Sequence, residues 1–147
     1  MRRIWLLIAL ITTALIVPAA HADSPTFTPL PASTFTDSTC GFDVTVQISA
    51  GETLKVFSNG TLIVSGPLTT TVSANGKTIT VAVPGPLVAV SGHAVYGLGV
   101  SFVPVQLPSG EILAVVAGKV DLSAFPTLPP TLVHGTVLLD VCAALAL

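Results

Sequence analysis

Residues 54–83, LKVFSNGTLIVSGPLTTTVSANGKTITVAV, decide the fold of this chain. Asn59-Gly60 and Asn75-Gly76 tolerate the positive φ of a two-residue turn, so each predicts a tight β-hairpin. In 78–83, apolar residues alternate with threonine and alanine, which is the period of a strand with one buried face. The segment therefore predicts an antiparallel meander.

The two-residue period continues on both sides of this meander. It recurs in 42–49, in 111–123 with a bulge expected at Gly118, and in a closing strand over 131–141. Pro84-Gly85-Pro86 cannot lie inside a central strand, so it marks a turn or a strand that switches sheets. No segment has a sustained helical period, and 143–147 is too short to predict a helix. We expect an all-β fold: a single-domain antiparallel β-sandwich or flattened closed barrel of about 8–10 short strands with one disulfide.

The first residues resemble a secretory signal peptide. Arg2 and Arg3 precede the apolar stretch 4–17, and Ala20-His21-Ala22 has the small-x-small pattern of a cleavage site between Ala22 and Asp23. The stretch is shorter than the roughly 20 residues of a membrane-spanning helix. An uncleaved membrane anchor is the alternative. We predict that the mature chain has no transmembrane span and is secreted, either extracellular or associated with the cell envelope.

Composition divides the chain into three parts. We assign 1–22 to the signal peptide, 23–39 to a leader rich in Pro, Thr and Ser, and 40–147 to the β domain. The leader is expected to be extended and held to the domain by Phe27, Leu30 and Phe35, although a flexible tether suits its first half equally well.

Two cysteines lie near the ends of the predicted β domain. Export to an oxidising compartment favours a Cys40–Cys142 disulfide, which would contribute about 4–5 kcal/mol by closing a loop of about 100 residues. Two free thiols or an intermolecular bridge are the alternatives. The alternation of side chains along a strand raises a difficulty for this disulfide. It places Cys40 on the same face as the apolar Phe42 and Val44, but Cys142 on the same face as the polar Asp140.

Charge excludes two classes of partner. The predicted mature chain carries no arginine, and its basic residues are Lys55, Lys77 and Lys119 against seven acidic residues. Nucleic-acid binding and attraction to anionic lipid headgroups both need clustered positive charge. We therefore expect no nucleic-acid partner.

No residue is assigned to catalysis, to a cofactor or to a metal. His93 and His134 are interpreted as residues of turns or strand ends, because no nucleophile-elbow motif accompanies them. With Cys40 and Cys142 they match a zinc set by count, but the short ligand spacing of zinc sites is missing.

The acidic residues are interpreted as surface charges. Asp43 and Asp140 lie next to the cysteines in sequence, yet calcium requires six to eight oxygen ligands. Glu52, Glu111 and Asp121 lie near predicted turns or on outward strand faces.

Three motifs carry a family resemblance. They are Cys40-Gly41-Phe42-Asp43-Val44, the two Asn-Gly turns, and Asp140-Val141-Cys142-Ala143-Ala144-Leu145. With them the chain resembles an uncharacterised family of small secreted actinobacterial β proteins with an N-terminal Cys-Gly-Phe and a C-terminal Asp-x-Cys-Ala-Ala-Leu. The resemblance implies a β fold and a terminal disulfide, and it implies no activity.

The sequence leaves three functional hypotheses. The first is a secreted, non-catalytic β domain that binds an unknown protein or a neutral glycan, since its surface is rich in Thr and Ser and poor in charge. The second is a secreted hydrolase with an unmarked site around a histidine. The third is self-association through exposed edge strands.

Overall fold

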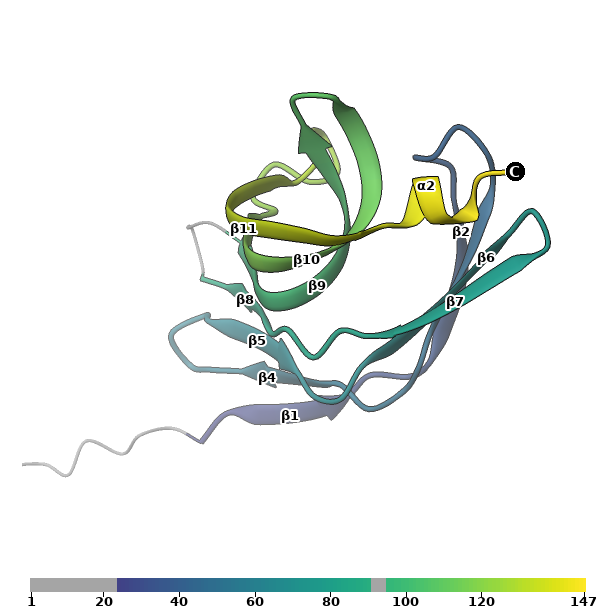
Figure 1. The fold of residues 1–147 in the computed structure, drawn as a ribbon. Coiled ribbons are helices and arrows are strands. Elements are labelled where there is room, and N and C mark those ends of the chain that lie inside the picture. The colour runs from purple at the N-terminus through teal and green to yellow at the C-terminus, as the bar shows by residue number, and fades with distance from the viewer. Residues whose placement is uncertain (1–23, 91–94) are drawn as a thin grey trace, which may run out of the picture.

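The computed structural model describes residues 24–90 and 95–147 as a sandwich of two β-sheets with one short helix (Figure 1). Almost all strand pairs are antiparallel, which confirms the predicted fold class. The predicted signal peptide and its cleavage site at Ala22 and Asp23 lie outside the described residues.

The larger sheet has seven strands in the order β1-β4-β5-β8-β9-β10-β11. Their bounds are β1 Thr26–Pro29, β4 Thr53–Val56, β5 Leu62–Ser65, β8 Leu87–Ala89, β9 Val95–Leu107, β10 Gly110–Asp121 and β11 Thr131–Asp140. The smaller sheet has four strands in the order β2-β3-β6-β7. Their bounds are β2 Ser33–Asp37, β3 Val44–Ile48, β6 Thr69–Ala74 and β7 Lys77–Ala82.

The first eight strands are the halves of four long strands that bend from one sheet into the other. β1 continues into β2, β3 into β4, β5 into β6, and β7 into β8, and each half pairs within its own sheet. The bends contain Pro31, Gly51, Gly66-Pro67 and Pro84-Gly85-Pro86. Of the two alternatives predicted for 84–86, a turn or a strand that switches sheets, the structure has the second.

Backbone hydrogen bonds and close glycine contacts hold the bends side by side. Ser49 N donates to Thr69 O at 2.9 Å, which continues the β3–β6 pairing into the bend. Gly51 and Gly66 have φ of 137° and 150°, and a Cβ on Gly66 would lie 2.4 Å from Gly51 O. These bends therefore require glycine, and they bring Glu52 to the junction of the two sheets.

Strands β9, β10 and β11 curl on themselves. β11 pairs with β10 along its length, and Thr131 also pairs with Gln106 of β9. A row of glycines, Gly99, Gly118 and Gly135, crosses the three strands in register. The bulge expected at Gly118 is wrong in position: the register shifts fall between Val115 and Val116 and between Lys119 and Val120. Gly118 instead allows the tight approach of β10 to β11.

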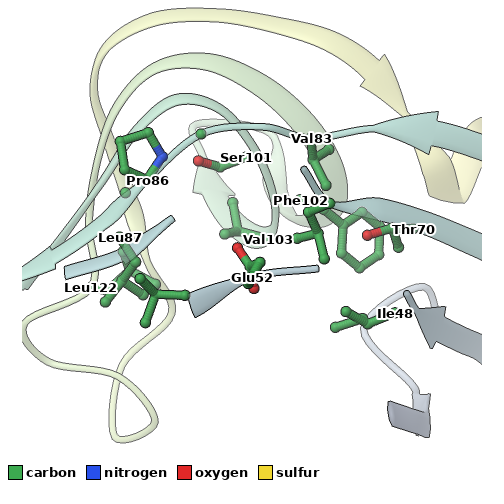
Figure 2. A pocket seen from close by; sticks show the side chains of 14 residues that line it. Ile48, Glu52, Thr70, Val83, Pro86, Leu87, Ser101, Phe102, Val103 and Leu122 are labelled. Carbon is green, nitrogen blue, oxygen red and sulfur yellow. The ribbon is translucent and has the colours of Figure 1, made fainter. Parts of the chain in front are cut away.

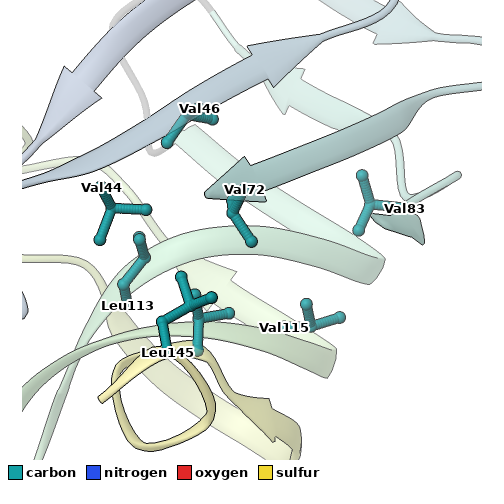
Figure 3. Close-up of a cluster of buried hydrophobic side chains, with 8 residues drawn as sticks. Val44, Val46, Val72, Val83, Leu113, Val115 and Leu145 are labelled. Carbon is teal, nitrogen blue, oxygen red and sulfur yellow. The ribbon is translucent and has the colours of Figure 1, made fainter. Parts of the chain in front are cut away.

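The core has two parts, and β10 separates them. Leu113 and Val115 pack with Val44, Val46 and Val72 of the smaller sheet (Figure 3). Their neighbours in β10 point to the opposite face and pack inside the curl; this second cluster comprises Val103, Val105, Ala114, Val116 and Val120. β10 is thus buried on both faces at 113–116, because it lies between the two layers.

The last element is a short helix, α2 (Val141–Leu145); the closing strand predicted over 131–141 therefore ends one residue earlier, at Asp140. Asp140 begins the helix, since its carboxylate accepts a hydrogen bond from Ala143 N at 2.9 Å. Val141 and Leu145, four residues apart, are fully buried on one helix face. Within the described ranges, no helix has the length and apolarity needed to cross a membrane.

The predicted disulfide is confirmed, and the helix removes the difficulty raised by strand alternation. Cys40 is bonded to Cys142 with Cα atoms 5.0 Å apart. Cys142 lies in α2, where strand alternation does not apply. The turn between β6 and β7 also holds this end, because Asn75 Nδ2 donates to Leu145 O at 2.9 Å and Lys77 Nζ donates to Ala146 O.

Residues 24–39, assigned to a leader by composition, form β1 and β2. Phe35 lies opposite Val46 in the smaller sheet, and Phe27 lies opposite Lys55 in the larger one. Their side chains stay largely exposed, so backbone pairing rather than aromatic packing attaches this segment. The β fold therefore extends upstream of Cys40.

Candidate functional site

The candidate residues considered from the sequence are dispersed. Asp43 is exposed, and Asp140 caps α2. His134 is exposed on β11 and lies opposite Lys119 of β10, while His93 falls outside the described residues. Among the residues that are described, no three His, Cys, Asp or Glu side chains gather as a metal site would require.

A cavity of about 180 Å³ lies where the bent strands cross from one sheet to the other. Both sheets and the bends between them supply its lining, mostly with apolar side chains such as Val83, Leu87, Phe102, Val103 and Leu122 (Figure 2); Val64 of β5 also lines it. A cavity of roughly 150 Å³ in another protein holds benzene. This one is therefore large enough for a single ring or a short chain.

Three polar side chains line the same cavity: Glu52 from the bend before β4, Thr70 from β6 and Ser101 from β9. In Figure 2 the Glu52 carboxylate lies centrally among the lining side chains. Thr70 is fully buried, and its Oγ1 has no hydrogen-bond partner in the described part of the chain. Buried hydroxyls nearly always have a partner, so this one is a group that a ligand can satisfy.

Partial burial raises the pKa of Glu52 above its ordinary value of 4.5. The folded chain therefore holds this proton more tightly than the unfolded chain does. As the pH rises from 4.5 through the folded-state pKa, the contribution of Glu52 to stability falls. The fold therefore disfavours the ionised form of this carboxylate, and a carboxylate shifted in this way inside a cleft is a candidate for a functional group.

A second feature is the outer face of the smaller sheet. Cross-strand register aligns its polar side chains in two rows: Thr34, Gln47, Thr71 and Thr80, and Thr36, Thr45, Ser73 and Thr78. Hydroxyls pair within each row, Thr71 with Thr80 at 2.9 Å and Ser73 with Thr78 at 3.0 Å. We call these eight residues the hydroxyl face. A shallow hollow of about 380 Å³ lies at its end near Ser49 and Thr69.

Polar groups also gather on the outside of the curl. Lys119 Nζ lies 3.6 Å from the centroid of the Tyr96 ring. Asp121 accepts hydrogen bonds from the Oγ of Ser123 at 2.5 Å and from its backbone N at 2.8 Å, and these bonds lower the pKa of Asp121. Asp121 and Ser123 thus form a hydrogen-bonded turn at the end of β10. Neither residue lines the cavity or the hollow.

No family model, no curated protein and no solved structure matches this chain. The resemblance to secreted actinobacterial β proteins stays a prediction.

The sequence did not reveal the cavity. Glu52 follows Gly51 at a turn, and this local context is that of an ordinary surface charge. Thr70 lies within a run of three threonines, and alternation alone does not mark it as buried. The Gly and Pro residues in the sequence indicate where strands bend. They do not indicate which side chains gather around the bends to form a cavity.

Proposed function

We propose that this chain is a non-catalytic, exported binding domain whose ligand is a small, mainly apolar molecule held in the cavity between the sheets. The observation that carries the proposal is the buried Thr70 hydroxyl, which lines an apolar cavity and has no partner among the described residues. A ligand with an apolar body and one polar group would fill the space and satisfy this hydroxyl.

Other observations support export and binding. The disulfide is of the kind that persists in oxidising compartments, and the first 22 residues have the pattern of a secretion signal. The described residues of the cavity lining include no histidine, and His134 lies opposite a lysine rather than an acid. Nothing in the described residues therefore favours the hydrolase alternative.

We expect benzyl alcohol, a single ring with one hydroxyl, to bind the oxidised protein with a Kd on the order of 1 mM. In an NMR titration, saturable shifts should be centred on Thr70 and Val103, which line the cavity. Val64→Phe should weaken binding at least about tenfold by filling the cavity. Ile63→Phe is the matched control, because Ile63 is adjacent in β5 but is not part of the lining. Equal binding by the two variants would contradict the proposal.

The hydroxyl face favours a second binding function, contact with a neutral glycan. Its eight side chains are uncharged, and they present hydroxyl and amide groups that can donate and accept hydrogen bonds. Individual bonds of this kind contribute about 0.5–1.5 kcal/mol, so an extended array is needed for retention. Self-association through the open edges of β2 and β7 stays a prediction.

Retention on microcrystalline cellulose tests the glycan function. Thr71→Lys places a charge in the middle of the hydroxyl face and should reduce retention at least about fivefold. Thr53→Lys adds the same charge to the larger sheet, outside this face, and should leave retention unchanged. If the wild-type protein is not retained, or if both variants behave alike, the hydroxyl face is not a glycan site.

A further inference from the structure

The cavity between the sheets has a distinctive charge pattern. Among the described residues of its lining, Glu52 is the one ionisable side chain, and the others are apolar, glycine, proline or hydroxyl-bearing. When Glu52 is ionised it contributes one negative charge, and the described lining residues supply no positive charge to balance it.

None of the three described lysines lines the cavity. Lys55 lies opposite Ile63 in the β4–β5 pair, whereas the neighbouring Leu54 lies opposite the cavity residue Val64. Lys77 donates to the end of α2, and Lys119 lies over the Tyr96 ring. Strand alternation places Lys55 on the sheet face away from the cavity, so none of the described lysines pairs with Glu52 and a cationic ligand could do so.

Ligand chemistry follows from this pattern. An ammonium group next to Glu52 would favour its ionised form and replace the water lost on burial. A carboxylate in the same place would be repelled, and a neutral polar group would gain only a hydrogen bond. The Thr70 and Ser101 hydroxyls can accept further N–H bonds, while Phe102, Val103 and Leu122 contact the apolar part.

We propose that the ligand of the cavity is a small amine, with a protonated amino group that pairs with Glu52 and an apolar body the size of one ring. This inference rests on the proposed binding function and specifies its ligand class. The cavity of about 180 Å³ sets the size, and the lone carboxylate sets the charge.

Three probes with the same ring test the proposal: benzylamine, benzyl alcohol and benzoate, titrated at neutral pH into the oxidised protein. Benzylamine should bind at least about tenfold more tightly than benzoate, with benzyl alcohol between them. In Glu52→Gln, benzylamine should fall to within about threefold of benzyl alcohol, whose own affinity should not change. Glu111→Gln removes the same charge from the exposed β9–β10 hairpin and should preserve the preference for the amine.

The outcomes separate the two proposals. If benzyl alcohol binds in the cavity and the amine binds no more tightly, the amine inference fails and the binding function stands. If the amine preference survives in Glu52→Gln, the preference arises elsewhere and the inference fails. If none of the three probes binds, both the inference and the cavity-binding function fail.

Discussion

Removal of the Cys40–Cys142 disulfide is expected to lower the free energy of unfolding by about 4–5 kcal/mol. The bonded residues are 102 positions apart, so the bridge closes nearly the whole β fold and strongly restricts the unfolded chain. The double variant Cys40→Ala/Cys142→Ala avoids free thiols and wrong pairings. Urea unfolding of this variant and of the wild-type protein measures the difference.

A second variant tests the packing of α2 separately from the disulfide. Leu145→Ala leaves the disulfide intact but removes a fully buried side chain of α2, for an expected loss of about 2–5 kcal/mol. If the disulfide acts mainly on the unfolded chain, the double cysteine variant should keep the native NMR shifts of Val141 and Leu145. A loss of less than about 1 kcal/mol in the double variant would contradict the chain-entropy explanation.

Gly118→Ala is expected to destabilise the protein by at least about 3 kcal/mol, and Gly135→Ala similarly. An added Cβ on Gly118 would lie 2.1 Å from His134 O, and one on Gly135 would lie 2.1 Å from Ala117 O. Both clashes involve backbone, which a side-chain rotation cannot relieve. Both glycines also have positive φ, 147° and 133°, that alanine rarely adopts.

Gly110→Ala is the control for backbone conformation alone. Gly110 has φ of 126°, but no atom would lie within 4 Å of a Cβ added to it. We expect it to lose only about 1–2 kcal/mol. Thermal or urea unfolding of the three variants measures the loss in free energy of unfolding. The loss in Gly110→Ala gives the cost of backbone strain alone, and the excess in the other two gives the cost of the steric clash. If Gly118→Ala costs no more than Gly110→Ala, the close approach of β10 and β11 is not what requires glycine.

Local sequence patterns predicted most of the strands correctly. The hairpin at Asn59-Gly60 forms, but the predicted two-residue turn is wrong in length, because β4 ends at Val56, β5 begins at Leu62, and of the two turn residues only Gly60 has a positive φ. The Asn75-Gly76 turn and the alternation in 78–83 are properties of a few neighbouring residues, and β6 and β7 form there as expected. Pro84-Gly85-Pro86 was identified as a break for an equally local reason, the missing N–H groups of proline. The same patterns did not show that Asn75 would also hold the end of α2, because its partner is 70 residues away.

The C-terminal segment shows where local patterns are ambiguous. Apolar residues continue from 137 through 145, interrupted by Asp140, and this content predicts a strand that extends past Asp140. The chain turns into a helix instead, because Asp140 caps it and the core accepts Val141 and Leu145 from one helix face. Five residues do not form a stable helix alone, and tertiary packing supplies the stability.

By itself, the sequence determined the β class, the Asn75-Gly76 hairpin and the break at 84–86, since each depends on local backbone preference. It favoured the Cys40–Cys142 disulfide over free thiols or an intermolecular bridge, and the structure has that disulfide. Only the tertiary structure decided that Glu52, Thr70 and Ser101 share one cavity. They come from the bend before β4, from β6 and from β9, and their proximity depends on how the bent strands cross between the sheets next to β9. Because the strands cross there, Glu52 is partly buried, and this partial burial makes it a candidate ligand-binding residue rather than an ordinary surface charge.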